Sequence, residues 1–315
     1  MTTSKKINIA LLAGGYSNER KVSLDSGDTV YCALDKGKYN IIRYDPRDDL
    51  KLLFDQRSNI DLALILLHGS LGEDGRIQGF LDTIGIPFVG SGILASAMAS
   101  NKKIAKHIYK NSGLNVARDI SLFKNEKCTP ELIIKNLGLL TVVKPVSEGS
   151  SLGVSVCKNK KELINGIRLA FQYNTEILVE QFVKGREISC CVIGNKELIT
   201  LPLVEVLPDQ KYNFFNYEAK YTPGATREIC PASISEEMEV KIQDSAKKAH
   251  SALKCSVWSR TDIIVKGSKV YVLETNTIPG MTETSLFPLS ARKAGLSMCQ
   301  LLDKLIELSL ESCHG

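Results

Sequence analysis

Short apolar runs alternate with amphipathic stretches over the first hundred residues. The apolar runs have the length of strands and lead towards glycines, and they cover 7–12, 60–67 and 86–89. Between them lie stretches with helical spacing, at 24–34 and 79–84. Strands that alternate with helices predict a parallel α/β sheet, and in such sheets the loops after the strands bind ligands. We therefore expect part of a binding site in the loops 14–19 and 68–75.

Beyond residue 95 the pattern predicts longer helices mixed with short strands. The expected helices are 95–111, 161–172, 236–253 and 298–310; the expected strands are 141–143, 154–156, 177–180, 188–193 and a hairpin over 261–273. Between residues 208 and 231, aromatic residues are frequent and no regular period is visible. A loop of this length is typical of an active-site lid.

Length and composition narrow the class of protein. The 315 residues suffice for about two domains, with three small ones also allowed. The chain is 43% hydrophobic and 24% charged, as is ordinary for a globular enzyme, and its net charge of +5 is not gathered into the basic run that nucleic-acid binding favours. The apolar run at 62–67 is far too short to span a membrane, and the polar start shows no signal peptide. Nine scattered cysteines and four dispersed histidines fit a reducing cytoplasm better than disulfides or zinc. Composition thus predicts a soluble cytoplasmic enzyme that binds neither nucleic acid nor membranes.

A glycine- and serine-rich loop follows one of the predicted strands. It runs from Lys144 to Gly153 and includes Glu148, Ser150 and Ser151. Glycines let the backbone approach a ligand, and exposed N–H groups and hydroxyls can hold phosphate oxygens. The loop lies between two strands and lacks Gly-Lys-Ser/Thr, so it is not a P-loop. Phosphate binding and a merely flexible hairpin are about equally favoured by this segment alone.

The hairpin 261–273 carries a candidate metal site. Glu274 and Asn276 are two residues apart on a strand, so they share a face. If the turn is of odd length, for example 267–269, Asp262 lies opposite Glu274. Two carboxylates so close repel each other unless a cation lies between them, and a set of oxygen ligands suits Mg²⁺. The alternative is an exposed polar hairpin end; because the surrounding strand residues are apolar, we favour the metal.

Two further loops are rich in glycine or in turn residues. The segment 277–285 contains Pro279-Gly280, whose exposed N–H groups could hold an oxyanion beside the metal strand. The segment 68–79 contains His68 and four glycines, which suggests close approach to a ligand or to another loop. For an isolated histidine after a buried strand, a structural role is the better expectation.

Together these motifs resemble the ATP-grasp superfamily and, within it, the D-alanine–D-alanine ligases. The resemblance covers about 7–310, with the motifs in the family's order. They are Glu19-Arg20-x-Val22-Ser23-Leu24, His68-Gly69-x-x-Gly72-Glu73-Asp74-Gly75, Glu148-Gly149-Ser150-Ser151-x-Gly153, Tyr217-Glu218-Ala219-Lys220-Tyr221 and Asn276-Thr277-x-Pro279-Gly280-Met281-Thr282. The resemblance implies an α/β ATP-grasp fold: an N-terminal parallel-sheet domain (1–98), and central (99–187) and C-terminal (188–315) α+β subdomains that grip the nucleotide between them.

The resemblance also implies a reaction and a role for each site residue. ATP phosphorylates the carboxylate of one D-alanine, and the amine of a second D-alanine attacks the acyl phosphate to give a peptidoglycan precursor. The implied nucleotide ligands are Lys102, Lys144, Glu148, Ser150, Ser151, Glu180, Val183, Glu187 and Lys220. Two Mg²⁺ ions, with Mn²⁺ as a substitute, are implied at Asp262, Glu274 and Asn276. The implied oxyanion hole consists of Arg260 and the N–H of Gly280. Glu19 and His68 are implied at the first substrate, Ser285 and Leu286 at the second, and Tyr221 in a loop that closes over Glu19 and Ser150. The family further implies a homodimer.

Two positions depart from the family's usual sequence, and rival functions stay open. The family usually has Met-Asp-Lys where this chain has Ser100-Asn101-Lys102, and a glycine where it has Ser259. The rival enzymes are a D-alanine–D-lactate or D-alanine–D-serine ligase, or another ATP-grasp carboxylate–amine ligase. The segment 218–221 has the dipeptide-forming sequence, so we expect D-alanine in both sites. A non-catalytic nucleotide-binding protein is disfavoured because the implied metal ligands and Arg260 are all present.

Overall fold

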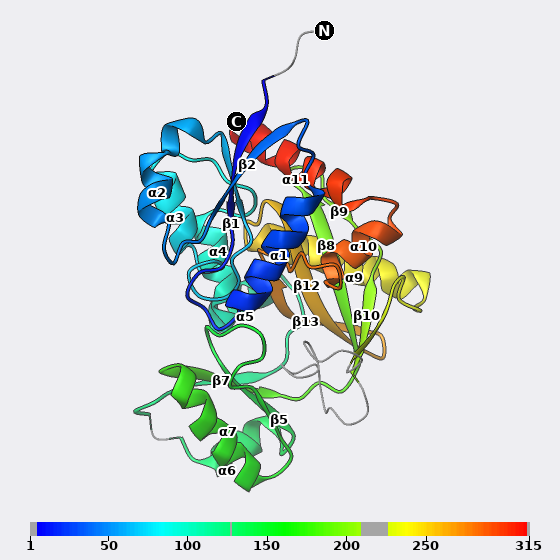
Figure 1. Cartoon of the computed structure of the whole chain (residues 1–315). Coiled ribbons are helices and arrows are strands. Elements are labelled where there is room, and N and C mark those ends of the chain that lie inside the picture. Colours follow the sequence, from blue (N-terminus) through cyan, green and yellow to red (C-terminus); the bar gives the residue numbers. More distant parts are fainter. Residues whose placement is uncertain (1–4, 127, 209–225, 314–315) are drawn as a thin grey trace.

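The computed structural model describes residues 5–126, 128–208 and 226–313, and in it three sheets follow one another along the chain (Figure 1). The first sheet is parallel, with the order β2-β1-β3, and consists of β1 (Ile7–Leu12), β2 (Tyr39–Tyr44) and β3 (Leu62–Ile65). Its helices are α1 (Arg20–Ala33), α2 (Leu50–Asp55) and α3 (Arg76–Thr83), with the short η1 (Arg57–Asn59). The parallel α/β sheet predicted from the first hundred residues is therefore confirmed, but the strand expected over 86–89 is wrong, because only an isolated bridge joins Phe88 to Ala63.

The second sheet is antiparallel and is covered by helices on one face. Its order is β4-β7-β5-β6, with β4 (Asp119–Phe123), β5 (Thr141–Pro145), β6 (Ser155–Cys157) and β7 (Glu176–Gln181). Helices α6 (Pro130–Leu137) and α7 (Lys160–Tyr173) bury a small apolar core against it. This unit is green at the bottom of Figure 1, where it stands apart from the blue N-terminal sheet.

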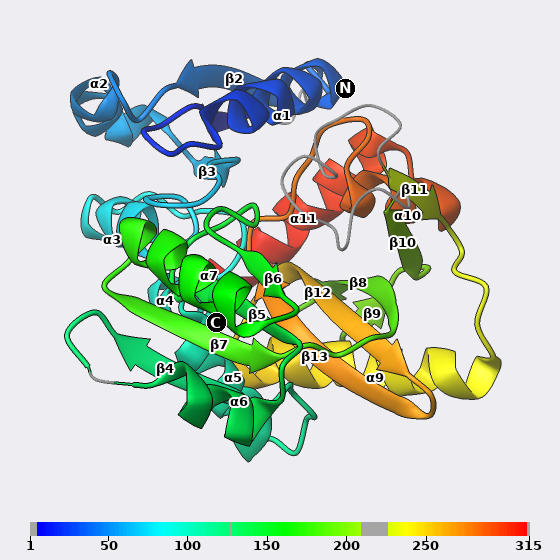
Figure 2. The same cartoon turned by 90° about the horizontal axis from the view of Figure 1, so that it is seen from below.

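The third sheet is larger and also antiparallel. Its order is β11-β10-β8-β12-β13 with β9 at the side of β8; the strands are β8 (Arg186–Gly194), β9 (Ile199–Thr200), β10 (Val204–Pro208), β11 (Thr226–Ile229), β12 (Val257–Lys266) and β13 (Lys269–Asn276). Figure 2 shows α9 (Glu236–Ala252) lying along this sheet. Helices α10 (Leu286–Lys293) and α11 (Met298–Cys313) end the chain, and no helix of the described residues is long and apolar enough to cross a bilayer.

Two apolar cores connect these units. The larger one joins the N-terminal sheet to α11 and to the start of β12, where Trp258 packs edge-on against Phe287 with ring centroids 5.2 Å apart. The second joins α9 and α5 (Lys102–Asn111) to strands β8, β12 and β13. The N-terminal sheet is therefore anchored to the third sheet, and α5 is packed between the third sheet and the second.

The predicted helix 95–111 is wrong in one respect, because it is two helices. Helix α4 (Ile93–Ser100) ends at Asn101, where ψ is 100°, and α5 starts at the next residue. The Asn101 side chain accepts a hydrogen bond from the N–H of Ile104 at 3.0 Å, as an N-cap does. The chain therefore turns at Asn101 and presents Lys102 at the start of a new helix.

The hairpin prediction reached the right pairing for the wrong reason. The turn is two residues long, because Lys266 pairs with Lys269. A β-bulge then makes Leu273 an extra residue, so that Ile263 lies opposite Val272 and Asp262 opposite Glu274. Asp262 and Glu274 thus face each other as expected, through a bulge instead of an odd turn.

Candidate active site

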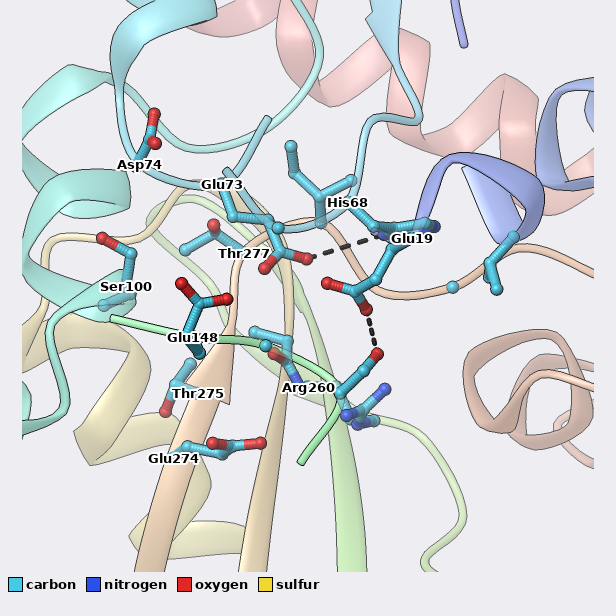
Figure 3. A pocket seen from close by; sticks show the side chains of 18 of the residues that line it. Glu19, His68, Glu73, Asp74, Ser100, Glu148, Arg260, Glu274, Thr275 and Thr277 are labelled. Carbon is cyan, nitrogen blue, oxygen red and sulfur yellow. Dashed lines mark hydrogen bonds and ion pairs between the residues drawn. The ribbon is translucent and has the colours of Figure 1, made fainter. Parts of the chain in front are cut away.

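A cavity of about 900 Å³ lies where the three sheets meet. It is lined from every part of the chain: by the loops after β1 and β3, the α4–α5 junction, the loop after β5, the end of β13 and the segment that leads into α10 (Figure 3). The predicted site residues among its lining are Glu19, His68, Lys102, Glu148, Ser150, Arg260, Glu274, Asn276, Gly280, Ser285 and Leu286. Segments far apart in the sequence therefore meet in one site.

Glu19 joins the N-terminal sheet to the glycine-rich loop. Its carboxylate accepts a hydrogen bond from the hydroxyl of Ser150. A Cβ on Gly149 would lie 2.5 Å from Glu19 Oε2, and one on Gly69 would lie 2.7 Å from the same atom. A side chain at either position would therefore displace the Glu19 carboxylate from the place it has here.

His68 is buried beside Glu19 and keeps one ring nitrogen available. Its Nδ1 lies 3.5 Å from Glu73 Oε1. Its Nε2 is buried and has no hydrogen-bond partner among the described residues. Such an unpaired nitrogen in the wall of a cavity is suited to a polar ligand.

Lys102 connects the glycine-rich loop to β13. Its ammonium donates a hydrogen bond to the backbone carbonyl of Glu148 and lies 4.0 Å from Glu274 Oε2. Its backbone N–H donates to the carbonyl of Val146 at 3.0 Å. Burial raises the pKa of the Glu148 carboxyl, which Lys102 partly counteracts. The cation thus lies between the loop and the predicted metal strand.

Arg260 and Asp262 form an ion pair with two hydrogen bonds, in which Asp262 is buried and the Arg260 side chain is 16% exposed. Arg260 Nε donates to Asp262 Oδ1 at 2.9 Å and Nη2 to Oδ2 at 2.8 Å, and Ser189 Oγ donates to Oδ1 at 2.6 Å. Burial would lower the pKa of Arg260, but the carboxylate of Asp262 offsets this and raises it. The guanidinium therefore stays charged at the edge of the cavity, while Asp262 lies behind it.

The three predicted metal ligands are neighbours, but only Glu274 and Asn276 line the cavity; Asp262 is absent from the lining residues. Asp262 is opposite Glu274, and Asn276 Nδ2 lies 3.5 Å from Asp262 Oδ2. Within the described ranges, no group of three or more His, Cys, Asp or Glu side chains could hold a metal ion. The set here is two carboxylates and one amide, whose oxygen atoms are the type of ligand that Mg²⁺ prefers. Asp262 would contact both the metal and Arg260.

The segment after β13 forms the far wall. Ser285 Oγ accepts a hydrogen bond from the N–H of Thr282 at 3.1 Å and lies 2.7 Å from the hydroxyl oxygen of Thr282. A Cβ on Gly280 would lie 2.9 Å from Ser285 Oγ. Ser285 and Leu286 thus stand at the start of α10, against a backbone turn that only glycine fits without movement.

Other predicted residues lie outside the cavity lining. Lys144 and Glu180 are buried against each other, with Nζ 2.8 Å from Oε2. Ser151, Val183 and Glu187 are also absent from the lining residues. Lys220 and Tyr221 lie outside the described residues. The ligand roles of all these residues stay predictions.

Sequence reasoning missed two side chains that the geometry makes prominent. Glu73 stood inside a motif, but its contact with His68 depends on how the loop folds back. Lys106 is buried against Glu180, and its only signal in the sequence is the four-residue spacing of Lys102, Lys106 and Lys110 along one face of a helix.

The fold and the site define the class of protein. The chain has two antiparallel α+β units that flank a cavity, with a parallel sheet beside them, and the cavity is lined by a lysine and by an acidic strand residue. This is the architecture of an ATP-grasp enzyme. Comparison with known proteins gives the family. The family model "D-ala D-ala ligase C-terminus" matches residues 108–307, and "D-ala D-ala ligase N-terminus" matches 47–91. The chain belongs to the D-alanine–D-alanine ligase family.

Individual relatives match over nearly their whole length. The D-alanine–D-alanine ligase of Syntrophobacter fumaroxidans is 50% identical, covering 98% of this chain and 99% of its own. That of Desulfotalea psychrophila is also 50% identical, over 99% of this chain and 98% of its own. Among solved structures, the Bacillus anthracis ligase complexed with ATP matches with a TM-score of 0.85 and 35% identity, over 97% of this chain and 98% of that one. The VanG D-Ala:D-Ser ligase of Enterococcus faecalis matches with a TM-score of 0.84 and 32% identity, over 97% of this chain and 100% of that one.

Proposed function

We propose that this protein joins two D-alanine molecules into D-alanyl-D-alanine at the expense of ATP, and so supplies a precursor of peptidoglycan. The observation that carries the proposal is the cavity itself. It brings Glu19 and Ser150 from one side together with Arg260 and Gly280 from the other, in a chain that is 50% identical to full-length ligases of this name.

The proposed chemistry has two steps. A carboxylate oxygen of the first D-alanine attacks the γ-phosphorus of ATP; an acyl phosphate forms and ADP leaves. The amine of the second D-alanine then attacks the acyl carbon, loses a proton, and the carbon–oxygen bond to phosphate breaks. Because both substrates are zwitterions and ATP is a polyanion, much of the catalysis is positioning and charge stabilisation.

The residues of the cavity have the donors and acceptors that these steps need. Glu19 and His68 are suited to the ammonium end of the first D-alanine. Arg260 and the N–H of Gly280 can stabilise the oxyanion of the tetrahedral intermediate. Ser285 and Leu286, at the start of α10, are placed for the carboxylate of the second D-alanine.

The nucleotide is proposed to lie between the second and third sheets. Its phosphates would meet Lys102, Lys144 and Lys220, with the Ser150 and Ser151 hydroxyls and the loop at Glu148. Glu180, Val183 and Glu187 are proposed on the adenosine side.

Asp262, Glu274 and Asn276 would hold the two Mg²⁺ ions, with Mn²⁺ as a substitute. When bound, these ions neutralise charge on the phosphates as the γ-phosphoryl group is transferred. Lys102, 4.0 Å from Glu274, already links this strand to the glycine-rich loop, so that the metal ligands and the loop are held in one arrangement.

A second candidate function is a ligase that accepts D-serine. The similarity to the D-Ala:D-Ser ligase of Enterococcus faecalis supports it, at 32% identity. The segment 218–221 resembles the dipeptide-forming ligases, however, and the two 50%-identical relatives carry the D-alanine–D-alanine name. We therefore favour D-alanine as the acceptor.

A coupled assay of ADP release tests the choice of acceptor. The enzyme is given ATP, Mg²⁺ and D-alanine, alone or with D-serine or D-lactate. We expect full turnover with D-alanine alone and little further increase with either competitor. No turnover with D-alanine alone, together with turnover once D-serine or D-lactate is added, would contradict the proposal.

A cytoplasmic location and a homodimeric assembly are also proposed. The cysteines from Cys32 to Cys299 are free thiols, which suits the reducing cytoplasm where ATP is available. The homodimer rests on membership of the family. Sedimentation at micromolar concentration distinguishes it from a monomer of 34.6 kDa.

A further inference from the structure

Three charged side chains are buried together beside the proposed nucleotide site. Glu180 on β7 lies between two lysines: its Oε2 is 2.8 Å from Lys144 Nζ, and its Oε1 is 2.5 Å from Lys106 Nζ. The exposed fraction is 5% for Glu180, 8% for Lys144 and 3% for Lys106. Lys144 and Glu180 have proposed roles in nucleotide binding, but Lys106, the most deeply buried, has none.

The pairing of β4 with β7 explains why a cation lies here. Glu180 is directly opposite Asp119 across the two strands, and like charges in such a pair repel. Lys106 Nζ lies 3.2 Å from Asp119 Oδ1 and so neutralises both carboxylates. Lys110, one turn further along α5, is 2.7 Å from the same Asp119 oxygen. Asp119 therefore has a second cation in Lys110, whereas the second cation of Glu180 is Lys144.

Nucleotide binding would change the ion pairs of Glu180. If Lys144 is to bind a phosphate, its ammonium must reduce or give up its contact with Glu180. A buried carboxylate that loses its last cation is strongly destabilised, because neither water nor another charge replaces the lost partner. With Lys106 present, Glu180 keeps one ion pair after Lys144 has moved.

We propose that Lys106 is a positioning residue for ATP: it neutralises Glu180 so that Lys144 can leave that carboxylate for the nucleotide phosphates. The inference rests on the proposed function, in which Lys144 binds phosphate. Lys106 touches no substrate and acts through Glu180. Glu180 is ionised, as this role requires: burial alone would raise its pKa, but the two lysines lower the pKa to about 2.

The test compares ligands with and without phosphates. In Lys106→Met, the affinity for a non-hydrolysable ATP analogue should fall by about tenfold or more, because binding of the analogue then leaves the buried Glu180 carboxylate without a cation. The affinity for adenosine, which does not need Lys144, should change by less than about twofold. Lys106→Arg keeps the charge and should retain most of the affinity. Unchanged affinity for the analogue in Lys106→Met, or an equal loss for adenosine, would overturn the proposal.

A matched control lies on the same helix. Lys103 forms an ion pair with Glu176, which is on the same strand as Glu180, but the Lys103 side chain is 43% exposed. Lys103→Met should bind the analogue and adenosine as the wild type does. A loss as large as that of Lys106→Met would show that any lysine removed from α5 has this effect, and would also overturn the proposal.

A double-mutant cycle with Glu180→Gln tests the route of the effect. Glutamine carries no charge to neutralise, so Lys106→Met should cost less than about threefold in that background, even if Lys106→Met alone folds poorly. A full tenfold loss there would overturn action through Glu180. If instead the wild type bound no ATP analogue and formed no dipeptide, the proposed function itself would be contradicted, and this inference with it.

Discussion

At the scale of single residues, the Glu19 carboxylate restricts what can stand at position 149. A Cβ there would lie 2.5 Å from Glu19 Oε2, and the hydrogen bond from Ser150 holds that carboxylate in place. The contact is with the end of a flexible side chain, not with backbone. A methyl group can therefore be accommodated, but only if Glu19 moves.

Gly149→Ala should accordingly damage activity more than stability. We expect kcat/KM for D-alanine to fall by about a hundredfold, since a shift of about 1 Å in a positioning group can cost that much. The thermal unfolding midpoint should stay close to that of the wild type. Gly92→Ala is the control, because a Cβ at Gly92 meets nothing within 4 Å and its φ of −72° suits any residue. Equal kinetics for the two variants would refute the role of Glu19.

Ser259 stands where the family usually has glycine, and its hydroxyl has a hydrogen-bond partner in the folded chain. Its hydroxyl lies 2.7 Å from Nδ1 of His250, which is buried at the end of α9. Burial lowers the pKa of His250 from 6.5 to about 4. The histidine is therefore neutral in the folded protein, and the serine supplies a polar partner for its ring.

This burial predicts a dependence of stability on pH. Between pH 6.5 and about 4 the unfolded chain binds a proton at His250 that the folded chain does not, so the free energy of unfolding falls as the pH falls. The group contributes up to about 3 kcal/mol across that window. Denaturant titrations at pH 7 and 4.5 should show a smaller difference for His250→Gln than for the wild type. An identical difference for both proteins would mean that His250 is not buried in the neutral form.

At the scale of elements, the break between α4 and α5 decides where Lys102 stands. Asn101 ends one helix and caps the next through its hydrogen bond to the N–H of Ile104. Aspartate, the usual residue of the family here, makes the same type of cap. Asparagine in place of aspartate therefore keeps the cap and lacks only the negative charge at the helix N-terminus.

Asn101→Ala should lower the free energy of unfolding by about 1 kcal/mol, because an N-cap is lost. It should also raise the KM for ATP, since Lys102 follows directly. Asn101→Asp should be as stable as the wild type or slightly more so. Chemical denaturation of the wild type and the two variants measures these free energies of unfolding. A stable Asn101→Ala variant, or a destabilised Asn101→Asp variant, would contradict the capping role.

The strands that the sequence predicted best are those with long apolar runs. β1, the strands around Ile188 and the hairpin of β12 and β13 have nearly continuous apolar runs, and all were found. β2 was missed because only Tyr39 and Tyr44 at its ends are buried, so its pattern does not alternate. The short elements β4, α6 and α10 were missed as well, because their partly buried faces leave little signal in five to eight residues. The bulge at Leu273 also left no local signal, because it arises from pairing between strands.

At the scale of the whole molecule, the site exists only because three sheets meet. Its lining side chains come from the loops after β1 and β3, from the α4–α5 junction, from the loop after β5, and from β12 and β13. The motifs identified most of these residues by type, through the resemblance to a family. Their contacts, such as Lys102 to Glu274 and Lys106 to Glu180, could not be predicted, because they depend on how α5 packs between two sheets. The boundaries proposed after residues 98 and 187 stay predictions, and limited proteolysis at both points would test them.

Binding of a nucleotide between these units should stabilise the whole chain. A non-hydrolysable ATP analogue with Mg²⁺ at a hundred times its Kd adds about 2.7 kcal/mol to the free energy of unfolding. For a protein of this size that raises the unfolding midpoint by about 5 °C or more. Lys102→Met should show a clearly smaller rise at the same analogue concentration. A rise equal to that of the wild type would argue against Lys102 as a phosphate ligand.

The central claim is that the protein ligates two D-alanines through an acyl phosphate, and isotope transfer tests it most directly. The protein is incubated with ATP, Mg²⁺ and D-alanine labelled with ¹⁸O in both carboxylate oxygens, and the products are analysed by mass spectrometry. We predict one D-alanyl-D-alanine for each ADP, and one ¹⁸O atom in each inorganic phosphate released. ADP formed without dipeptide, or dipeptide formed with unlabelled phosphate, would contradict it.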